Sequence, residues 1–220
     1  MAKDAVHKAH QRLRAHFGER QQWWPAQTAF EVLVGAVLTQ NTAWTNVERA
    51  MARLLERDWL SAPAIIEAPE AALAECLRPS GYYNVKARRL RAACERWIEL
   101  GEENGLRAMA PEAAREALLA VNGLGPESVD DVLLYGLQQP VFVVDAYTHR
   151  IFHRMGLAPA RYHYHRLQAF FHERLPADAR LFGEYHALII ELGKGFCRPR
   201  QPRCSACPLQ SICQTGRSVT

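Results

Sequence analysis

Four of the six cysteines are crowded into one short segment near the C-terminal end of the chain. Cys197, Cys204, Cys207 and Cys213 follow the spacing Cys-x6-Cys-x2-Cys-x5-Cys. Four thiolates this close together in a cytosolic protein indicate a metal centre rather than disulfides. Structural zinc sites usually offer two Cys-x-x-Cys hooks, whereas a single hook flanked by lone cysteines favours an iron–sulfur cubane. Zinc is the alternative, because four cysteines can bind either metal.

A second stretch with chemical potential is VNGLGPESVDD, residues 121–131, which has the outline of a tight turn between two helices. Gly123 and Gly125 would let the backbone approach a ligand closely, and Pro126 suits the first position of the following helix. Free amides at such a helix start can hold a phosphate group. Taken alone, the Gly-x-Gly turn is equally compatible with an ordinary α-hairpin.

A single carboxylate, Asp145, follows 20 residues after Gly125 and closes the extended run PVFVVD. A carboxylate in such a place can stabilise a developing cation, and it can orient or deprotonate water. The alternative is a structural role as the N-cap of the next helix, and one residue can serve both purposes. Asparagine caps a helix about as well as aspartate, so Asp145→Asn would separate the two roles.

Helices must position these groups, because apolar residues recur at intervals of three and four along most of the chain. The 220 residues are 49% hydrophobic, which is enough for a substantial core. PVFVVD is a β-like run, but one isolated run does not make a sheet, so we expect an all-α protein. The helices predicted from this pattern are 29–40, 47–60, 70–77, 84–100 and 111–121.

Charge and hydropathy point to a polyanionic partner and away from a membrane. The formal net charge is only +4, but positive residues gather between Arg78 and Arg96 and again after Glu191. Two local basic surfaces suit a polyanion, although solvated helix faces would give the same pattern. The chain has no run of 18 apolar residues, and its charged start lacks the apolar centre of a signal peptide. We therefore expect a soluble cytoplasmic protein.

The hairpin turn, the downstream Val-Asp and the four-cysteine loop occur in an order and spacing that resemble the endonuclease III branch of the helix-hairpin-helix DNA glycosylases. The segments LVGAVLTQNT (33–42) and GYYNVKARRL (81–90) are similar to further parts of that family. The resemblance implies an all-α fold of two lobes. One is a six-helix lobe, 24–134, ending with the hairpin. The other joins 1–23 to 135–220 and carries a [4Fe–4S] cluster loop at 197–213.

The same resemblance implies a reaction and assigns residues to it. These enzymes flip a damaged base out of double-stranded DNA, bound between the lobes, and cut its N-glycosidic bond. Asp145 matches their essential carboxylate, while Gln40 and Tyr82 match residues that fill the gap left by the base. Around the flipped base we expect Trp23, Trp24, Trp44, Tyr147 and Glu127. Further DNA contacts are expected from Gly123, Gly125, Lys86, Arg198 and Arg200. We expect the protein to act as a monomer.

Glu127 departs from the pattern of the family members that also nick the DNA strand. Those members use an amine at this place to form a Schiff base, which a carboxylate cannot do. The chain has only four lysines, Lys3, Lys8, Lys86 and Lys194, and none is near the turn in sequence. The sequence therefore predicts a monofunctional glycosylase without lyase activity.

The stretch GLGPESVDDVLLYG (123–136) is similar to the 3-methyladenine DNA glycosylase III subgroup, as are WWP (23–25) and VVDAYTH (143–149). This resemblance implies alkylated purines as substrates, and their positive charge favours stacking on electron-rich rings. Two alternatives stay open at the level of sequence. One is a glycosylase for oxidised or mismatched pyrimidines, and the other is a catalytically silent iron–sulfur protein that binds damaged DNA.

Overall fold

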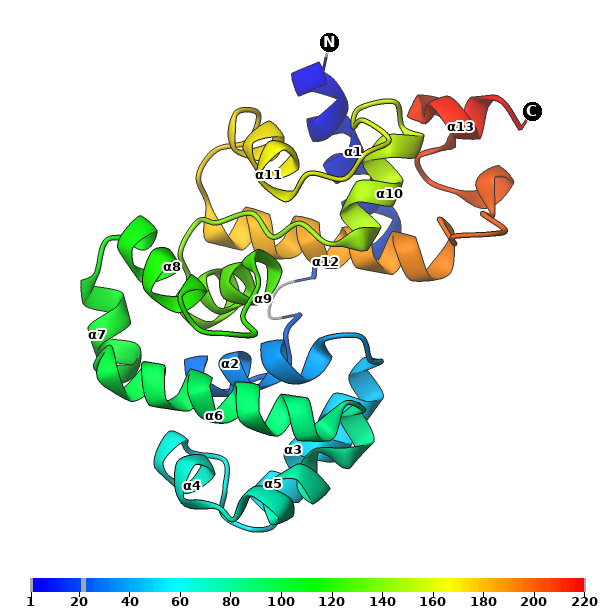
Figure 1. The fold of residues 1–220 in the computed structure, drawn as a ribbon. Helices are drawn as coiled ribbons and strands as arrows, with labels where there is room; N and C mark the ends of the chain where they lie inside the picture. The colour runs from blue at the N-terminus through cyan, green and yellow to red at the C-terminus, as the bar shows by residue number, and fades with distance from the viewer. Residues whose placement is uncertain (1, 21–22, 220) are drawn as a thin grey trace. The chain divides into compact units, whose positions relative to one another are not determined.

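The structure is a computed structural model that describes residues 2–20 and 23–219. Every regular element within these residues is helical, which confirms the expected all-α class for them (Figure 1). Residues 140–145 run without regular structure and belong to no strand. Over the same described residues, no helix is long and apolar enough to cross a membrane.

The helices form two compact units. The central unit is Trp24–Gln139, and the terminal unit combines Met1–Trp23 with Pro140–Thr220. The junction after the central unit thus falls five residues later than the 134/135 position expected from the sequence. Each unit has its own apolar interior, and each contains some of the residues proposed for function.

The central unit is built around α2 (Ala29–Thr39), whose residues 32–38 are almost completely buried. Thr28 starts this helix, because its side chain accepts a hydrogen bond from the amide of Glu31 at 3.1 Å. Around α2 pack α3 (Trp44–Leu55), α6 (Tyr83–Glu99), α9 (Pro126–Asp131) and the π-helical turn η2 (Val132–Gly136). The remaining elements are α4 (Ala62–Glu67), α5 (Glu70–Leu77), η1 (Arg78–Ser80), α7 (Glu102–Ala108) and α8 (Pro111–Leu119).

The central unit, all of whose residues are described, thus holds eight α-helices instead of the six expected. The two additional ones are α4 and α7, each too short to display a clear helical period. The predicted helix 47–60 is displaced, since α3 begins at Trp44 and ends at Leu55. Asp58 has a left-handed backbone with φ of 56°, which is incompatible with continuing the helix.

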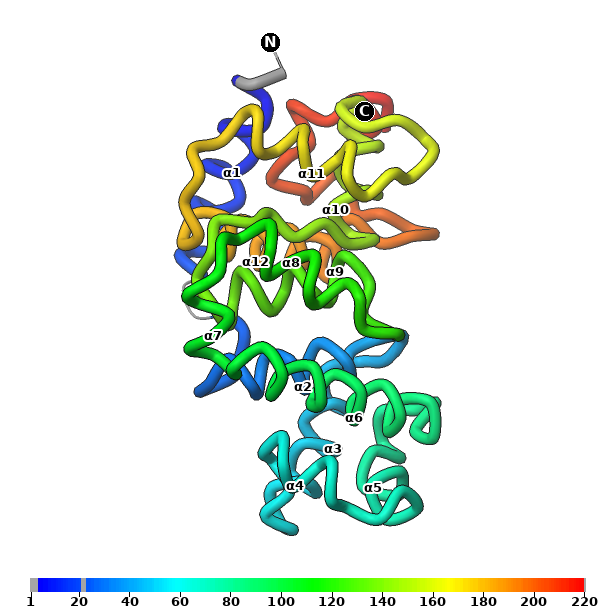
Figure 2. The backbone as a smooth tube through the Cα atoms, turned by 60° about the vertical axis from the view of Figure 1, so that its left-hand side comes forward, coloured from blue at the N-terminus to red at the C-terminus, as the bar shows by residue number. Residues whose placement is uncertain are grey.

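Helices α8 and α9 form the predicted hairpin and lie side by side in both views of the chain (Figures 1 and 2). A buried ion pair joins the two arms. The guanidinium of Arg115 donates from Nε and Nη2 to the two carboxylate oxygens of Asp130, at 2.6 and 3.1 Å. The Asp130 side chain is fully buried, so this two-pronged pair fixes one arm of the hairpin against the other.

The terminal unit is organised by α12 (Ala179–Gly195), which packs against α1 (Ala2–Phe17) and α10 (Ala146–Arg154) (Figure 1). Asp178 caps α12 by accepting from the amides of residues 180 and 181. The buried Tyr185 ring packs among phenylalanines, and its hydroxyl donates to the carbonyl of Val6 at 2.9 Å. The other elements are α11 (Tyr164–His172), η3 (Cys204–Ala206), η4 (Gln210–Ile212) and α13 (Gln214–Arg217).

Candidate functional site

Asp145 is the N-cap of α10, and its carboxylate is nevertheless buried in the way a catalytic group can be. Its Oδ1 accepts two hydrogen bonds of 2.7 Å, one from the amide and one from the hydroxyl of Thr148. Only 6% of the residue is exposed. The two bonds hold one carboxylate oxygen and leave Oδ2 directed to a different neighbour.

That neighbour is His186 of α12, a residue that the sequence analysis did not single out. Its Nε2 lies 3.8 Å from Oδ2 of Asp145, and both side chains are buried. Burial alone would raise the pKa of the carboxyl group, but the attraction of His186 and the bonds from Thr148 outweigh it. The pKa of Asp145 is therefore lowered from its ordinary value of 3.8. The carboxylate stays ionised at neutral pH although it is shielded from water.

Tyr147 is held in place by its surroundings in the terminal unit. Its ring packs against Gly193 of α12 so closely that any side chain at position 193 would collide with it. The guanidinium of Arg150 lies 4.9 Å from the ring centroid, an arrangement that attracts the cation to the ring. Arg150 also donates from Nε to the carbonyl of Cys197 at 2.8 Å. The Tyr147 ring is thus fixed, and a cation already covers one of its faces.

The adjacent tryptophans Trp23 and Trp24 belong to different units. In the terminal unit, Trp23 meets His186 in an edge-on arrangement with the ring centroids 6.2 Å apart. The ammonium of Lys194 lies 5.9 Å from the Trp23 ring. Trp23 therefore packs behind His186, the residue that faces Asp145.

In the central unit, Trp24 and Trp44 come together with Tyr135. The Trp24 centroid lies 5.3 Å from that of Trp44 and 5.2 Å from that of Tyr135. Gly35 makes room for them, because a Cβ there would lie only 3.1 Å from the Trp24 ring. Two of the aromatic residues expected around the base thus form one group, to which the structure adds Tyr135.

The two hairpin glycines differ in whether backbone conformation and packing require glycine at their positions. Gly123 has φ of 99°, and a side chain there would collide with that of Arg89, so the fold requires glycine. Gly125 has an ordinary φ of −90°, and a Cβ at this position would meet nothing within 4 Å. Neither conformation nor internal packing explains glycine at position 125, which leaves space for an outside group. Glu127 is exposed in the first turn of α9.

The two residues expected to fill the gap in DNA, Gln40 and Tyr82, differ in their burial and their contacts. Gln40 is half-buried, and its side-chain nitrogen donates to the carbonyl of Gly123 at 2.9 Å. Its side-chain oxygen accepts from Arg89 at 2.6 Å. Tyr82 is 73% exposed and has a left-handed backbone with φ of 46°. Such backbone strain in an exposed aromatic residue is typical of functional positions.

Lys86 does not lie on the surface, in contrast to its expected role as a DNA contact. Only 1% of the residue is exposed, and its ammonium donates to the carbonyls of Leu38 and Ser80 at 2.8 and 2.7 Å. Burial, with a smaller contribution from the charge of Arg89, lowers the pKa of Lys86 to about 8. A phosphate cannot reach an ammonium in this position, so any effect of Lys86 on DNA binding is indirect.

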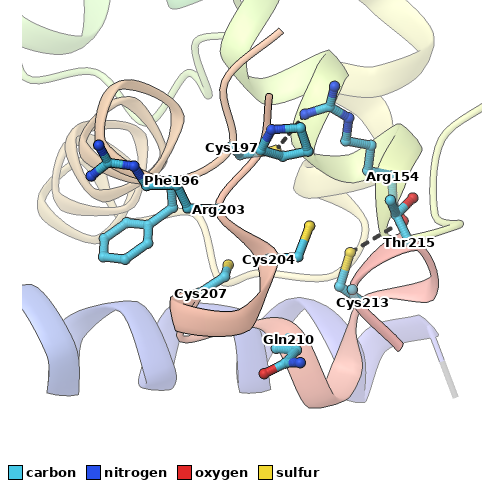
Figure 3. Close-up of a pocket in the computed structure, with 11 residues that line it drawn as sticks. Arg154, Phe196, Cys197, Arg203, Cys204, Cys207, Gln210, Cys213 and Thr215 are labelled. Carbon is cyan, nitrogen blue, oxygen red and sulfur yellow. Dashed lines mark hydrogen bonds between the residues drawn. The ribbon is translucent and has the colours of Figure 1, made fainter. Parts of the chain in front are cut away.

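The four cysteines of the C-terminal loop line one pocket, together with residues that include Phe196 and Arg154 (Figure 3). All four are free thiols and half-buried. Arg154 reaches them from α10. It donates from Nη1 to Sγ of Cys197 at 3.3 Å, and its carbonyl accepts from Sγ of Cys213 at 3.2 Å. Arg198 and Arg200, which follow the first cysteine, are exposed.

The chemistry of this pocket fits an iron–sulfur cluster. A cubane takes one thiolate at each of its irons, so its cysteines must surround a cavity instead of converging on one point. Four cysteines around one pocket meet this requirement.

Comparison with known proteins identifies the family. A family model described as the HhH-GPD superfamily of base excision DNA repair proteins matches residues 34–177, which is more than half of the chain. The chain belongs to this superfamily. As an HhH-GPD protein it is a DNA glycosylase of base excision repair, an enzyme that hydrolyses N-glycosyl bonds, and its partner is DNA. This confirms the family resemblance seen in the sequence.

Individual proteins and solved structures are also similar to this chain. A candidate DNA repair glycosylase of Methanocaldococcus jannaschii is 41% identical over 213 residues, covering 96% of each chain. A solved 3-methyladenine DNA glycosylase of H. pylori, bound to 1,N6-ethenoadenine, is 29% identical with a TM-score of 0.73, covering 88% of this chain and 97% of that one. Endonuclease III, trapped as a covalent intermediate with DNA, has a TM-score of 0.85 at 21% identity and covers 100% and 99%, which shows the shared fold.

The contrast between the two hairpin glycines can be tested directly. We expect Gly125→Ala to change the free energy of unfolding by less than about 1 kcal/mol, because its φ and the space around it suit alanine. The same substitution should weaken binding to duplex DNA severalfold, since the Cβ would fill space that we expect a phosphate to occupy. The matched control Gly123→Ala should instead destabilise the fold. Chemical denaturation and fluorescence anisotropy measure the two effects. Unaltered DNA affinity in Gly125→Ala would remove this position from the interface.

The lowered pKa of Asp145 predicts how its contribution to stability depends on pH. The carboxyl group binds its proton less readily in the folded than in the unfolded chain, so its stabilising effect is fully present above the unfolded pKa of 3.8. It is lost as the pH falls from there through the folded pKa. The difference in unfolding free energy between wild type and Asp145→Asn should shrink on acidification below about pH 5. A difference that grows on acidification would contradict the assigned shift.

Proposed function

We propose that the protein is a monofunctional DNA glycosylase, which removes a damaged base by hydrolysis and leaves the DNA strand intact. One contrast supports this best. The buried, ionised Asp145 carboxylate is held in place by Thr148, while Glu127, exposed in the first turn of α9, stands where strand-nicking relatives would need an amine. The protein acts as a monomer on double-stranded DNA.

Asp145 alone can support base removal by hydrolysis. As the base departs, the sugar to which it was attached acquires oxocarbenium character. A nearby carboxylate can stabilise this positive charge, and it can also orient the water molecule that attacks the sugar. Because Thr148 fixes Oδ1 in advance, little reorganisation is needed when the positive charge develops. Shielding from water strengthens the attraction between carboxylate and cation. No covalent bond between protein and DNA is required.

Strand cleavage needs a free amine, and the central unit does not supply one. Its only lysine is Lys86, whose ammonium is buried and donates to two carbonyls. In the terminal unit, Lys194 is exposed beside the Trp23 ring. Lys194 is therefore a second amine to test, because it contacts the Trp23 ring, which in turn contacts His186 beside Asp145.

Alkylated purines are the proposed substrates. An N3- or N7-alkylated purine carries positive charge, leaves readily and stacks on electron-rich rings. The group of Trp24, Trp44 and Tyr135 offers such rings, and the exposed carboxylate of Glu127 would attract a cationic base. The similarity to a 3-methyladenine DNA glycosylase supports the same class. Arg150 on the face of Tyr147 argues against stacking of a cationic base on that face.

A [4Fe–4S] cluster is the proposed cofactor, held by Cys197, Cys204, Cys207 and Cys213 around their common pocket. When bound, the cluster would supply four metal–thiolate bonds that fix the loop. The exposed Arg198 and Arg200 lie within that loop. Fixing it would hold their positive charges ready for phosphates, so that DNA affinity falls steeply with salt.

The proposal is tested by comparing base release from duplexes that contain 7-methylguanine, uracil or thymine glycol in one assay. We expect release of the alkylated purine and an intact, abasic strand, which breaks only after treatment with alkali. Release of a pyrimidine lesion alone would replace the alkylated-purine substrate by the pyrimidine alternative. Binding to all three duplexes without release of any base would favour the silent binder.

The same reactions, run with sodium borohydride, test for lyase chemistry. We expect no covalent protein–DNA complex from wild type, because Glu127 stands where a Schiff base would need an amine. Glu127→Lys is the informative companion, since it restores an amine in the first turn of α9 and should gain trapping. A trapped complex with wild type would overturn the monofunctional assignment, and its loss in Lys194→Gln would identify the amine.

A further inference from the structure

Lys86 is a buried cation, and the need to fill space in the core does not explain why a charged residue lies there. Removing an ammonium from water costs free energy, and the lowered pKa of about 8 reflects this cost. An apolar residue of similar volume would pack with less penalty. The hydrogen bonds of Lys86 are therefore the feature that distinguishes it from such a residue.

The two acceptors of Lys86 lie at the ends of α2 and η1, the two elements that lead directly into the turns carrying the proposed gap-filling residues. One is the carbonyl of Leu38, two residues before Gln40, and the other is the carbonyl of Ser80, two residues before Tyr82. Both turns contain a left-handed non-glycine residue. These are Asn41, with φ of 56°, and Tyr82 itself, with φ of 46°. One ammonium thus joins the ends of α2 and η1, which are far apart in sequence and each lead into a strained turn.

Arg89 extends the same arrangement one turn further along α6. Its guanidinium donates to the side-chain oxygen of Gln40 at 2.6 Å, and its side chain packs against Gly123 of the hairpin. Gln40 in turn donates to the carbonyl of Gly123 at 2.9 Å. Helix α6 therefore fixes the backbone of both turns through Lys86 and the side chain of one of them through Arg89.

We propose that Lys86 is a positioning residue for DNA insertion, whose ammonium sets the spacing of the Gln40 and Tyr82 turns so that both side chains enter the gap left by the flipped base. The proposal rests on the proposed function, in which these two residues occupy the gap. Lys86 acts on them through the backbone, and it touches neither the DNA nor Asp145. Its effect should appear in recognition of a gap and be absent from general affinity for phosphates.

The probe is a duplex in which a tetrahydrofuran abasic analogue lies opposite 2-aminopurine, so that insertion changes the fluorescence of the orphan base. It reports on the gap without any base being excised. Lys86→Met keeps the side-chain volume but removes all three donors. We expect Lys86→Met to bind an undamaged duplex like wild type. Its preference for the abasic duplex over the undamaged one should fall roughly tenfold, which is within the range of coupling between contacting residues. The fluorescence change should be lost.

Three further variants make the result specific. Lys86→Gln retains N–H donors and should recover part of the preference, which also covers the case in which Lys86→Met does not fold. Arg88→Met removes an exposed charge from the same helix and should weaken binding to both duplexes alike. In a Gln40→Ala/Tyr82→Ala background, Lys86→Met should have no further effect on the preference, because Lys86 acts through those two residues.

Several outcomes would overturn the proposal. In Lys86→Met, these are an unchanged preference and fluorescence signal, or an equal loss of affinity for both duplexes. A further loss of preference when Lys86→Met is added to the Gln40→Ala/Tyr82→Ala background would also contradict it, as would the absence of a fluorescence change with wild type. Failure of the proposed function looks different. In that case the insertion signal would persist and depend on Lys86, while wild type would release no base from any damaged duplex.

Discussion

The rest of the candidate site depends on the two hydrogen bonds from Thr148 to one oxygen of Asp145. They start α10, and they bury a carboxylate while satisfying it. They also leave the second oxygen directed to His186. Burial alone would favour the neutral acid, and the net lowering of the pKa shows that these partners more than compensate for it. A single N-cap therefore serves the fold and, in the proposed function, the chemistry as well.

Helix α10 links this carboxylate to the cysteine pocket within the same unit. Arg150 contacts both the Tyr147 ring and the carbonyl of Cys197. One turn later, Arg154 contacts the sulfurs of Cys197 and Cys213, donating to the first through its side chain and accepting from the second through its carbonyl. The helix that begins with Asp145 thus ends against the loop proposed to hold the cluster. A change in that loop has a short structural route to the residues around Asp145.

Much of the fold was predictable because its main signals are local. The helical period and the hairpin punctuation are read directly from neighbouring residues, as is the capping role of Asp145. The short helices α4 and α7 escaped prediction because six or seven residues do not display a period. His186 could not be found, because only the packing of α10 on α12 brings it to a carboxylate 41 residues earlier in the chain.

Lys86 is an intermediate case. Because Lys86 is positively charged and lies in a basic cluster of the sequence, it was expected on the protein surface that binds DNA. By its spacing, however, Lys86 lies on the same face of α6 as the buried residues Leu90, Cys94 and Trp97. The spacing therefore contained the signal, but residue type outweighed it. Its acceptors, the carbonyls of Leu38 and Ser80, are set by tertiary structure and leave no mark in the sequence.

In the proposed mechanism, a fixed carboxylate carries out base excision without an amine. The most direct measurement is the single-turnover rate of base release by Asp145→Asn, on the damaged duplex that wild type processes best. Asparagine preserves the cap and removes the charge. We expect a folded variant that binds the duplex like wild type and releases the base at least about a hundredfold more slowly. A folded Asp145→Asn variant with the wild-type rate would contradict the proposed mechanism.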